Sequence, residues 1–149
     1  MSLNKIAFIG TGVMGSSVVG HLLQANYEVT IYTRTKEKAA TLIEEGAKWS
    51  ETASTATAGA DIVFTMVGYP ADVESIYFGA NGIFEGSKEG QIIVDMTTSS
   101  PALAKRIAQE AMNRNMASID APVSGGDVGA KNGTLSIMCG GDTEVFEKV

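Results

Sequence analysis

Short apolar runs rich in β-branched residues alternate along the chain with longer segments of helical periodicity. The runs are apolar on both faces, as in strands that helices cover on both sides. Alternating strands and helices are typical of a mostly parallel sheet. The pattern predicts an α/β fold with a doubly wound sheet and helices on both faces. Strands are expected at Lys5–Ile9, Glu28–Thr33, Ile62–Met66, Gln91–Asp95, Met116–Ala121 and Thr134–Cys139, and helices at Val13–Gln24, Lys36–Glu45, Ala71–Phe78 and Ala102–Asn115.

Residues that start helices occur at two informative places. Ser100 and Pro101 form a typical start, a serine cap followed by proline in the first turn. Asp142 is placed to cap a helix that begins at Thr143, and no helix-stop signal follows. We therefore expect residues 1–149 to be one domain of a longer protein, cut just before an interdomain helix.

The composition argues against several classes of protein. The formal net charge is −6, whereas a nucleic-acid surface needs clustered lysine and arginine. No apolar run reaches the roughly 18 residues of a membrane span, and the N-terminus lacks a signal-peptide pattern. Cys139 is the single cysteine, which excludes an intrachain disulfide. We expect a cytoplasmic protein with no nucleic-acid partner and no membrane contact.

Three glycines follow the first predicted strand and open the first predicted helix. In this context the spacing Gly-x-Gly-x-x-Gly is typical of a turn that binds the pyrophosphate of a dinucleotide. Gly10 permits the tight turn, Gly12 lets the backbone approach the phosphates, and Gly15 allows close helix–strand packing. The motif predicts a Rossmann-type domain; the alternative is a turn that binds nothing. The expected cofactor-binding residues of the turn are Gly10, Thr11, Gly12, Val13, Met14 and Gly15.

The end of the second predicted strand indicates which dinucleotide fits. An acidic residue there would accept a hydrogen bond from the ribose 2′-hydroxyl of NAD, but the stretch Thr33-Arg34-Thr35 contains no acid. The guanidinium of Arg34 suits a 2′-phosphate, and the two threonines add hydroxyl donors. We therefore expect NADP as the preferred cofactor, with NAD as the alternative; Arg34 could instead be a solvated surface residue.

Two further segments, Asp95–Pro101 and Asp120–Leu135, carry a family likeness. With the glycine turn and Thr33-Arg34-Thr35, they resemble the β-hydroxyacid dehydrogenases, in the same order along the whole chain. That family includes 3-hydroxyisobutyrate dehydrogenase, tartronate semialdehyde reductase and the glyoxylate and succinic semialdehyde reductases. The resemblance implies an NADP-dependent oxidoreductase that interconverts a small 3-hydroxy acid and its semialdehyde or oxo acid by hydride transfer.

The resemblance also implies roles for particular residues. Thr33 stands where NADP-preferring members have asparagine, so an amide is lost and a hydroxyl remains. Val67 and Gly68 lie in a strand end that runs along the cofactor, where members usually have Met-Leu-Pro. This departure removes a loop shape that proline would fix. Thr98 matches a threonine on the nicotinamide side of the cofactor.

Ser124, Gly125 and Gly126 match the substrate-binding segment of the family. Hydride transfer to a carbonyl builds negative charge on its oxygen, and hydroxyl and main-chain N–H donors stabilise that charge. Ser124 is therefore the candidate catalytic donor to the reacting oxygen. The alternative is a glycine-rich turn that links two strands.

The general acid of the family is a lysine on the long helix that follows this domain. Its matching position lies beyond residue 149, so this chain alone is expected to be inactive. The full-length protein is expected to add an all-helical domain and to form a homo-oligomer. The alternatives are a 6-phosphogluconate dehydrogenase-like enzyme, an imine reductase-like enzyme and a non-catalytic NADP-binding module.

The remaining reactive side chains are assigned to structural roles. His21, the single histidine, lies in the first predicted helix with no nucleophile nearby, which favours a packing or surface role. Cys139 lies in an apolar predicted strand and is expected to be a core thiol. No cluster of histidine, cysteine and carboxylate residues has metal-ligand spacing, so no metal site is predicted. Tyr32 and Trp49 are expected to pack, and helix and strand ends are expected to be capped by Asp61, Asp72 and Glu74.

Overall fold

The computed structural model describes residues 4–97 and 100–149. Its strands are β1 Lys5–Ile9, β2 Glu28–Tyr32, β3 Lys48–Trp49, β4 Ile62–Thr65, β5 Ile92–Asp95, β6 Ala117–Asp120, β7 Val123–Ser124, β8 Ser136–Ile137 and β9 Gly140–Gly141. Its helices are α1 Val13–Gln24, α2 Ala40–Glu44 with a 3-10 turn at Lys36–Ala39 before it, α3 Ala53–Ala58, α4 Pro70–Phe78, α5 Ile83–Gly86, α6 Pro101–Asn113, α7 Gly126–Asn132 and α8 Thr143–Lys148.

The main sheet of the described residues has the strand order β3-β2-β1-β4-β5-β6-β9. Strands β1 to β6 pair in parallel, and β9 joins β6 in the antiparallel direction. From β1 the chain runs outward to β2 and β3, and it then returns to add β4 on the other side of β1. In sheets of this kind, ligands bind outside the carboxyl ends of the strands where this reversal occurs.

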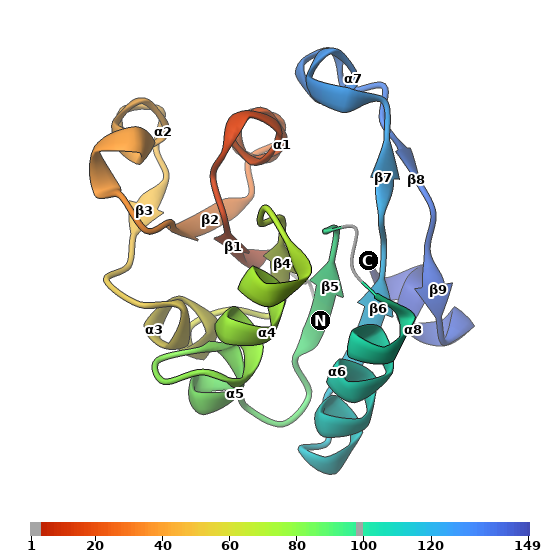
Figure 1. Ribbon diagram of the computed structural model, residues 1–149. Coiled ribbons are helices and arrows are strands. Elements are labelled where there is room, and N and C mark those ends of the chain that lie inside the picture. The colour runs from red at the N-terminus through yellow and green to blue at the C-terminus, as the bar shows by residue number, and fades with distance from the viewer. Residues whose placement is uncertain (1–3, 98–99) are drawn as a thin grey trace.

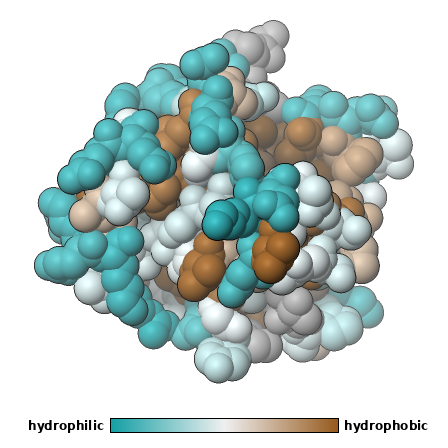
Figure 2. All heavy atoms as spheres, turned by 90° about the horizontal axis from the view of Figure 1, so that it is seen from above, coloured by the Kyte–Doolittle hydropathy of each residue, from teal (hydrophilic) through white to brown (hydrophobic). Residues whose placement is uncertain are grey.

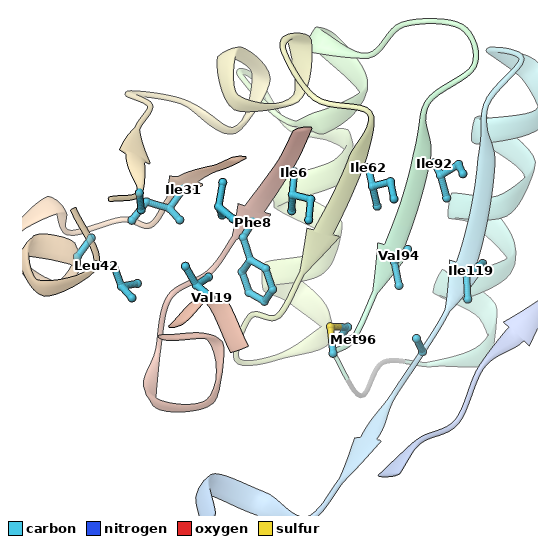
Figure 3. Close-up of a cluster of buried hydrophobic side chains, with 14 residues drawn as sticks. Ile6, Phe8, Val19, Ile31, Leu42, Ile62, Ile92, Val94, Met96 and Ile119 are labelled. Atoms are coloured by element: carbon cyan, nitrogen blue, oxygen red, sulfur yellow. The ribbon is translucent and has the colours of Figure 1, made fainter. Parts of the chain in front are cut away.

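Alternate residues of β1 pack on opposite faces of the sheet, because successive side chains of a strand point in opposite directions. Phe8 is buried in one cluster with Val19 of α1 and further residues of α2 and the neighbouring strands (Figure 3). Ile9 is buried in a second cluster with Val73 of α4 and with residues of α3, α5 and α6. Helices therefore cover both faces (Figure 1), which confirms the predicted doubly wound, mostly parallel sheet.

The predicted helix starts at Ser100 and Asp142 are confirmed. The Ser100 hydroxyl accepts a hydrogen bond from the Leu103 N–H at 3.1 Å and caps α6. Asp142 Oδ1 accepts a hydrogen bond from the Glu144 N–H at 2.8 Å and caps α8. These local signals are reliable because a cap satisfies N–H groups that have no partner within the helix.

The strand expected at Thr134–Cys139 is shorter than predicted, and it does not join the main sheet. Within it, Ser136–Ile137 forms β8, which pairs with β7 in a separate two-stranded ladder. A ladder of this size has no second layer, so Ile137 and Met138 are half-exposed. Cys139 is exposed as well, and the prediction of a core thiol is wrong for the same reason. Sequence analysis also missed the short elements β3, β7, β9, α3, α5 and α7.

Within the described ranges, no helix combines the length and the apolar character that crossing a membrane requires.

Candidate cofactor-binding site

The glycine turn lies between β1 and α1 and is enclosed by the protein on one side. Gly10 has a φ of +97°, and a Cβ at this position would overlap the main-chain oxygen of Met66. A Cβ at Gly15 would overlap the carbonyl oxygen of Gly10. Internal packing therefore requires glycine at both positions, and it brings the start of α1 close to the end of β4.

Gly12 differs from the other two glycines of the motif. A Cβ at Gly12 would meet no heavy atom of the described residues within 4 Å, and its φ of −69° is open to any residue. Neither packing nor backbone conformation accounts for glycine here. Gly12 instead lines a pocket, so the close approach of a ligand to the backbone explains it best.

Thr11 supplies a second observation that points to a ligand. The residue is 4% exposed, and its hydroxyl has no hydrogen-bond partner among the described residues. A buried hydroxyl without a partner is costly. Thr11 lines the same pocket as Gly12. An open approach to the turn and an unsatisfied hydroxyl beside it fit a ligand with hydrogen-bond acceptors, such as a pyrophosphate.

The pocket has a volume of about 500 Å³ and lies at the carboxyl ends of β1, β2 and β4. Figure 2 shows the molecule from above the view of Figure 1, with hydrophobic residues scattered among hydrophilic and intermediate ones on this face. The structure brings eleven of the predicted cofactor-binding residues to this one pocket: Gly10, Thr11, Gly12, Val13, Met14, Gly15, Thr33, Arg34, Thr35, Val67 and Gly68. Thr98, the twelfth, lies outside the described residues.

Arg34 is exposed at the β2 end of the pocket, where its side chain is 74% accessible. Its Nη2 donates to Oδ1 of Asp72 at 2.5 Å. The other oxygen of Asp72 accepts a hydrogen bond from the Tyr69 N–H at 3.1 Å, so Asp72 caps α4 as expected. Glu74, also expected to be a cap, instead forms an ion pair with Arg106.

Lys38 also lines this end of the pocket, and sequence analysis missed it. It follows Arg34 by four residues and lies in the 3-10 turn before α2. Both cations are therefore placed to attract a phosphate. A cation one turn after Arg34 is the sequence signal that could have identified it.

Tyr32, at the same end, stacks on Trp49 with ring centroids 6.1 Å apart. The expectation that these two rings pack is confirmed.

The predicted substrate residues lie apart from this pocket. Ser124 is in β7, and Gly125 and Gly126 open α7; all three are exposed and none lines the pocket. The next residue, Asp127, does line it. The segment is thus adjacent to the pocket. It connects the strand β7 to the helix α7, so the alternative of a glycine-rich turn that links two strands is wrong.

His21 connects the two regions. Its Nε2 lies 2.9 Å from the carbonyl oxygen of Ala130 and 3.1 Å from that of Lys131, near the end of α7. The helix that begins at the glycine turn is thereby bonded to the helix that follows the substrate segment. The assignment of His21 to packing or the surface agrees with this position.

A buried polar cluster lies beside the pocket, at the ends of β4 and β5. Asp95 is 5% exposed. Its Oδ1 accepts hydrogen bonds from the Thr65 hydroxyl at 2.8 Å and from the Thr97 N–H at 3.0 Å. The Thr97 hydroxyl in turn accepts a hydrogen bond from the Val67 N–H at 2.9 Å. Sequence analysis gave Asp95 no role beyond the family likeness.

Asp120, at the end of β6, is the register partner of Asp95. Burial and the neighbouring charge of Asp95 raise the pKa of Asp120 above its ordinary value. Two carboxyl groups thus lie side by side at the ends of the adjacent strands β5 and β6.

Comparison with known proteins identifies relatives over nearly the whole chain. A family model described as the NAD binding domain of 6-phosphogluconate dehydrogenase matches residues 5–149. An uncharacterized oxidoreductase, YkwC, of Bacillus subtilis is 55% identical over 95% of this chain and 49% of its own length. The probable 3-hydroxyisobutyrate dehydrogenase-like 1 of Arabidopsis thaliana, named as mitochondrial, is 50% identical over 99% of this chain and 45% of its own. The 2-hydroxy-3-oxopropionate reductase of Escherichia coli is 43% identical, with 97% and 49% covered.

Solved structures agree with these matches. Psf3, in complex with NADP+ and 2-OPP, has a TM-score of 0.90 at 31% identity and covers 95% of this chain and 50% of its own. The 3-hydroxyisobutyrate dehydrogenase of Mycobacterium tuberculosis, with L-serine, has a TM-score of 0.91 at 30% identity, with 99% and 50% covered. The chain spans about half the length of the curated relatives it matches. It belongs to the family of NAD-binding domains found in 6-phosphogluconate dehydrogenase and 3-hydroxyisobutyrate dehydrogenase, as its motifs had indicated.

Proposed function

We propose that this chain is the NADP-binding part of an oxidoreductase that interconverts a small 3-hydroxy acid and its semialdehyde or oxo acid. The observation that carries the proposal is the pairing of Gly12 and Thr11 in one pocket: a glycine that packing does not require, beside a buried hydroxyl without a partner among the described residues. The names of the Arabidopsis and Escherichia coli relatives support the substrate class.

Different residues of the pocket would bind different parts of the cofactor. The N–H groups at the start of α1 have no partners within the helix, so the turn can donate to a pyrophosphate. Arg34 and Lys38 would bind the 2′-phosphate that distinguishes NADP from NAD. When bound, the nicotinamide supplies the hydride. NADP in the Psf3 complex supports this choice of cofactor.

On the substrate side, Ser124 and the main-chain N–H groups of Gly125 and Gly126 would donate to the carboxylate and to the reacting oxygen. Donors fixed at that oxygen stabilise the negative charge that develops on it. The proton would come from a lysine in the part of the longer protein that follows residue 149, by resemblance to the family. Cytoplasmic localisation and a homo-oligomeric full-length protein also remain proposals.

Titration calorimetry of this chain tests the cofactor. We expect NADPH to bind more tightly than NADH. Arg34→Ala should weaken NADPH binding about tenfold, the worth of one charge-assisted hydrogen bond, and should leave NADH binding unchanged. Lys36→Ala is the matched control, because it removes the same charge from an exposed residue nearby that does not line the pocket. Equal affinities of the wild-type chain for the two cofactors would overturn the preference, and no binding of either would overturn the cofactor role.

The reaction is tested on the full-length protein with NADPH and a panel of succinic semialdehyde, tartronate semialdehyde and glyoxylate. We expect oxidation of NADPH with at least one of them. If the chain binds NADPH but the full-length protein turns over none of the panel, the proposed substrate class fails while the cofactor assignment stands.

A further inference from the structure

We propose that Asp95 and Thr97 are positioning residues that hold the nicotinamide-side wall of the cofactor pocket in place. The proposal rests on the function proposed above, since the wall matters only if a nicotinamide dinucleotide binds. We call the four residues Thr65, Val67, Asp95 and Thr97 the Asp95 clamp.

The direction of the cofactor follows from the placement of the charges. Arg34 and Lys38 lie at the β2 end of the pocket, and the glycine turn follows β1. A dinucleotide held by its 2′-phosphate at one end and its pyrophosphate in the middle extends across the switch point of the sheet. Its nicotinamide half therefore lies toward β4 and β5, which are the strands that the Asp95 clamp joins.

The clamp links two segments that follow adjacent strands. Thr65 and Asp95 are the last residues of β4 and β5 and are register partners. The bond from the Thr65 hydroxyl to Asp95 at 2.8 Å ties the strand ends together. The bond from the Val67 N–H to the Thr97 hydroxyl at 2.9 Å ties together the segments that follow them. Asp95 orients Thr97 by accepting the N–H of that residue at 3.0 Å.

Val67 connects the Asp95 clamp directly to the pocket. Val67 lines the pocket together with Met66 and Gly68. A Cβ at Gly10 would lie 2.8 Å from Cγ1 of Val67, so the Val67 side chain packs on the glycine turn. If the Val67 N–H loses its acceptor, the wall can move away from the turn and from the ligand.

Burial supports a positioning role for the carboxylate. Thr65 is fully buried and Thr97 is 4% exposed, so water does not compete for these bonds. The Tyr77 hydroxyl, also fully buried, lies 3.0 Å from the Thr65 hydroxyl on the side of the sheet core. Because the Thr65 proton goes to Asp95, Tyr77 is the donor of that bond. The hydroxyl of Thr65 and the N–H of Thr97 thus both donate to Asp95. A buried network whose polar groups are hydrogen-bonded in this way favours a single arrangement of its side chains.

The test compares NADPH with 2′-phospho-ADP-ribose, which has the same phosphates but no nicotinamide. Both are titrated into the chain by calorimetry. Thr97→Val keeps the shape of the side chain and removes the acceptor of the Val67 N–H. We expect it to weaken NADPH binding about fivefold, the worth of one ordinary hydrogen bond, and to leave binding of the analogue within about twofold. Thr97→Ser keeps the hydroxyl and should restore the wild-type affinity for NADPH.

Tyr77→Phe is the structural control. It removes a buried hydrogen bond on the core side of Thr65 and should lower stability without changing either affinity. Amide hydrogen exchange at Val67 gives a second measurement, and it should quicken in Thr97→Val and not in Tyr77→Phe.

Equal loss for both ligands in Thr97→Val, or no loss for NADPH, would overturn the clamp. If the wild-type chain binds neither ligand, the proposed function fails first, and the clamp fails with it.

Discussion

The glycine turn and the segment Ser124–Gly126 are both rich in glycine, but the protein encloses them very differently. Gly10 faces main-chain atoms of Met66, and Gly15 faces the carbonyl oxygen of Gly10. A Cβ at Gly125, in contrast, would come within 3.4 Å only of the Leu135 side chain among the described residues, at 3.2 Å. A Cβ at Gly10 or Gly15 would overlap main-chain atoms, whereas a Cβ at Gly125 would meet a side chain that can move.

The two regions also differ in how many contacts hold them in place within this chain. The turn is packed against β4 and is connected through Val67 to the Asp95 clamp. Ser124 ends one strand of the two-stranded ladder, Gly125 and Gly126 open α7, and all three are exposed. His21 contacts main-chain oxygens near the end of α7 and so connects that helix to α1. Packing within this chain therefore fixes the position of the glycine turn, whereas the donors of the Ser124–Gly126 segment are exposed.

Replacing Gly10 should have the largest effect on stability. Gly10→Ala places a side chain at a φ of +97° and against the main-chain oxygen of Met66. Strain and overpacking together should cost about 3 kcal/mol or more, measured as the free energy of unfolding in urea. Gly46→Ala is the control, because Gly46 has a φ of +116° and open space around a Cβ. If the two variants lose the same stability, the contact with Met66 is not the cause.

Gly125→Ala should cost less and would sharpen the contrast. Its φ of +131° is also unfavourable for alanine, but the Leu135 side chain can turn away. We expect a loss of about 1–2 kcal/mol, close to that of Gly46→Ala. Binding of NADPH by calorimetry should not change, since Gly125 does not line the pocket. A loss as large as that of Gly10→Ala would mean that the substrate segment is as tightly enclosed as the turn.

The smallest effect concerns Asp120, at the end of β6. Burial and the charge of Asp95 raise the pKa of Asp120 in the folded chain. Folding therefore favours the protonated form, and stability is lost as the pH rises from the ordinary pKa of about 3.8 through the raised folded value. Since Asp120 is partly exposed, solvent screens the charge and we expect the loss to be small.

Asp120→Asn removes that titration, so its stability relative to the wild type should increase between pH 3 and pH 7. Urea unfolding across this range measures the difference. Asp127→Asn, the same change of charge at an exposed position, is the control. A constant difference between Asp120→Asn and the wild type would contradict the assignment.

Several features of the site could be predicted from sequence because each depends on a short stretch of chain. The glycine spacing, Arg34 after β2 and the Ser100 cap were all identified this way, and the first helix was predicted at Val13–Gln24 as observed. The strand prediction failed at Thr134–Cys139, where apolar residues lie in a ladder without a covering layer. Periodicity reports apolar character, and it cannot report whether a second layer is present to bury it.

By itself, the sequence of this protein determined the alternation of strands and helices, the phosphate-type turn and the family. Only the tertiary structure decided that Arg34 pairs with Asp72, that Lys38 joins the same pocket, and that Asp95 holds Thr65 and Thr97. The physical reason is distance along the chain. Caps and periodic faces arise between residues a few positions apart, whereas Arg34 and Asp72 are 38 residues apart and Thr65 and Asp95 are 30 apart. The parallel register that sets the ends of β4 and β5 side by side creates the second contact, and no local signal encodes that register.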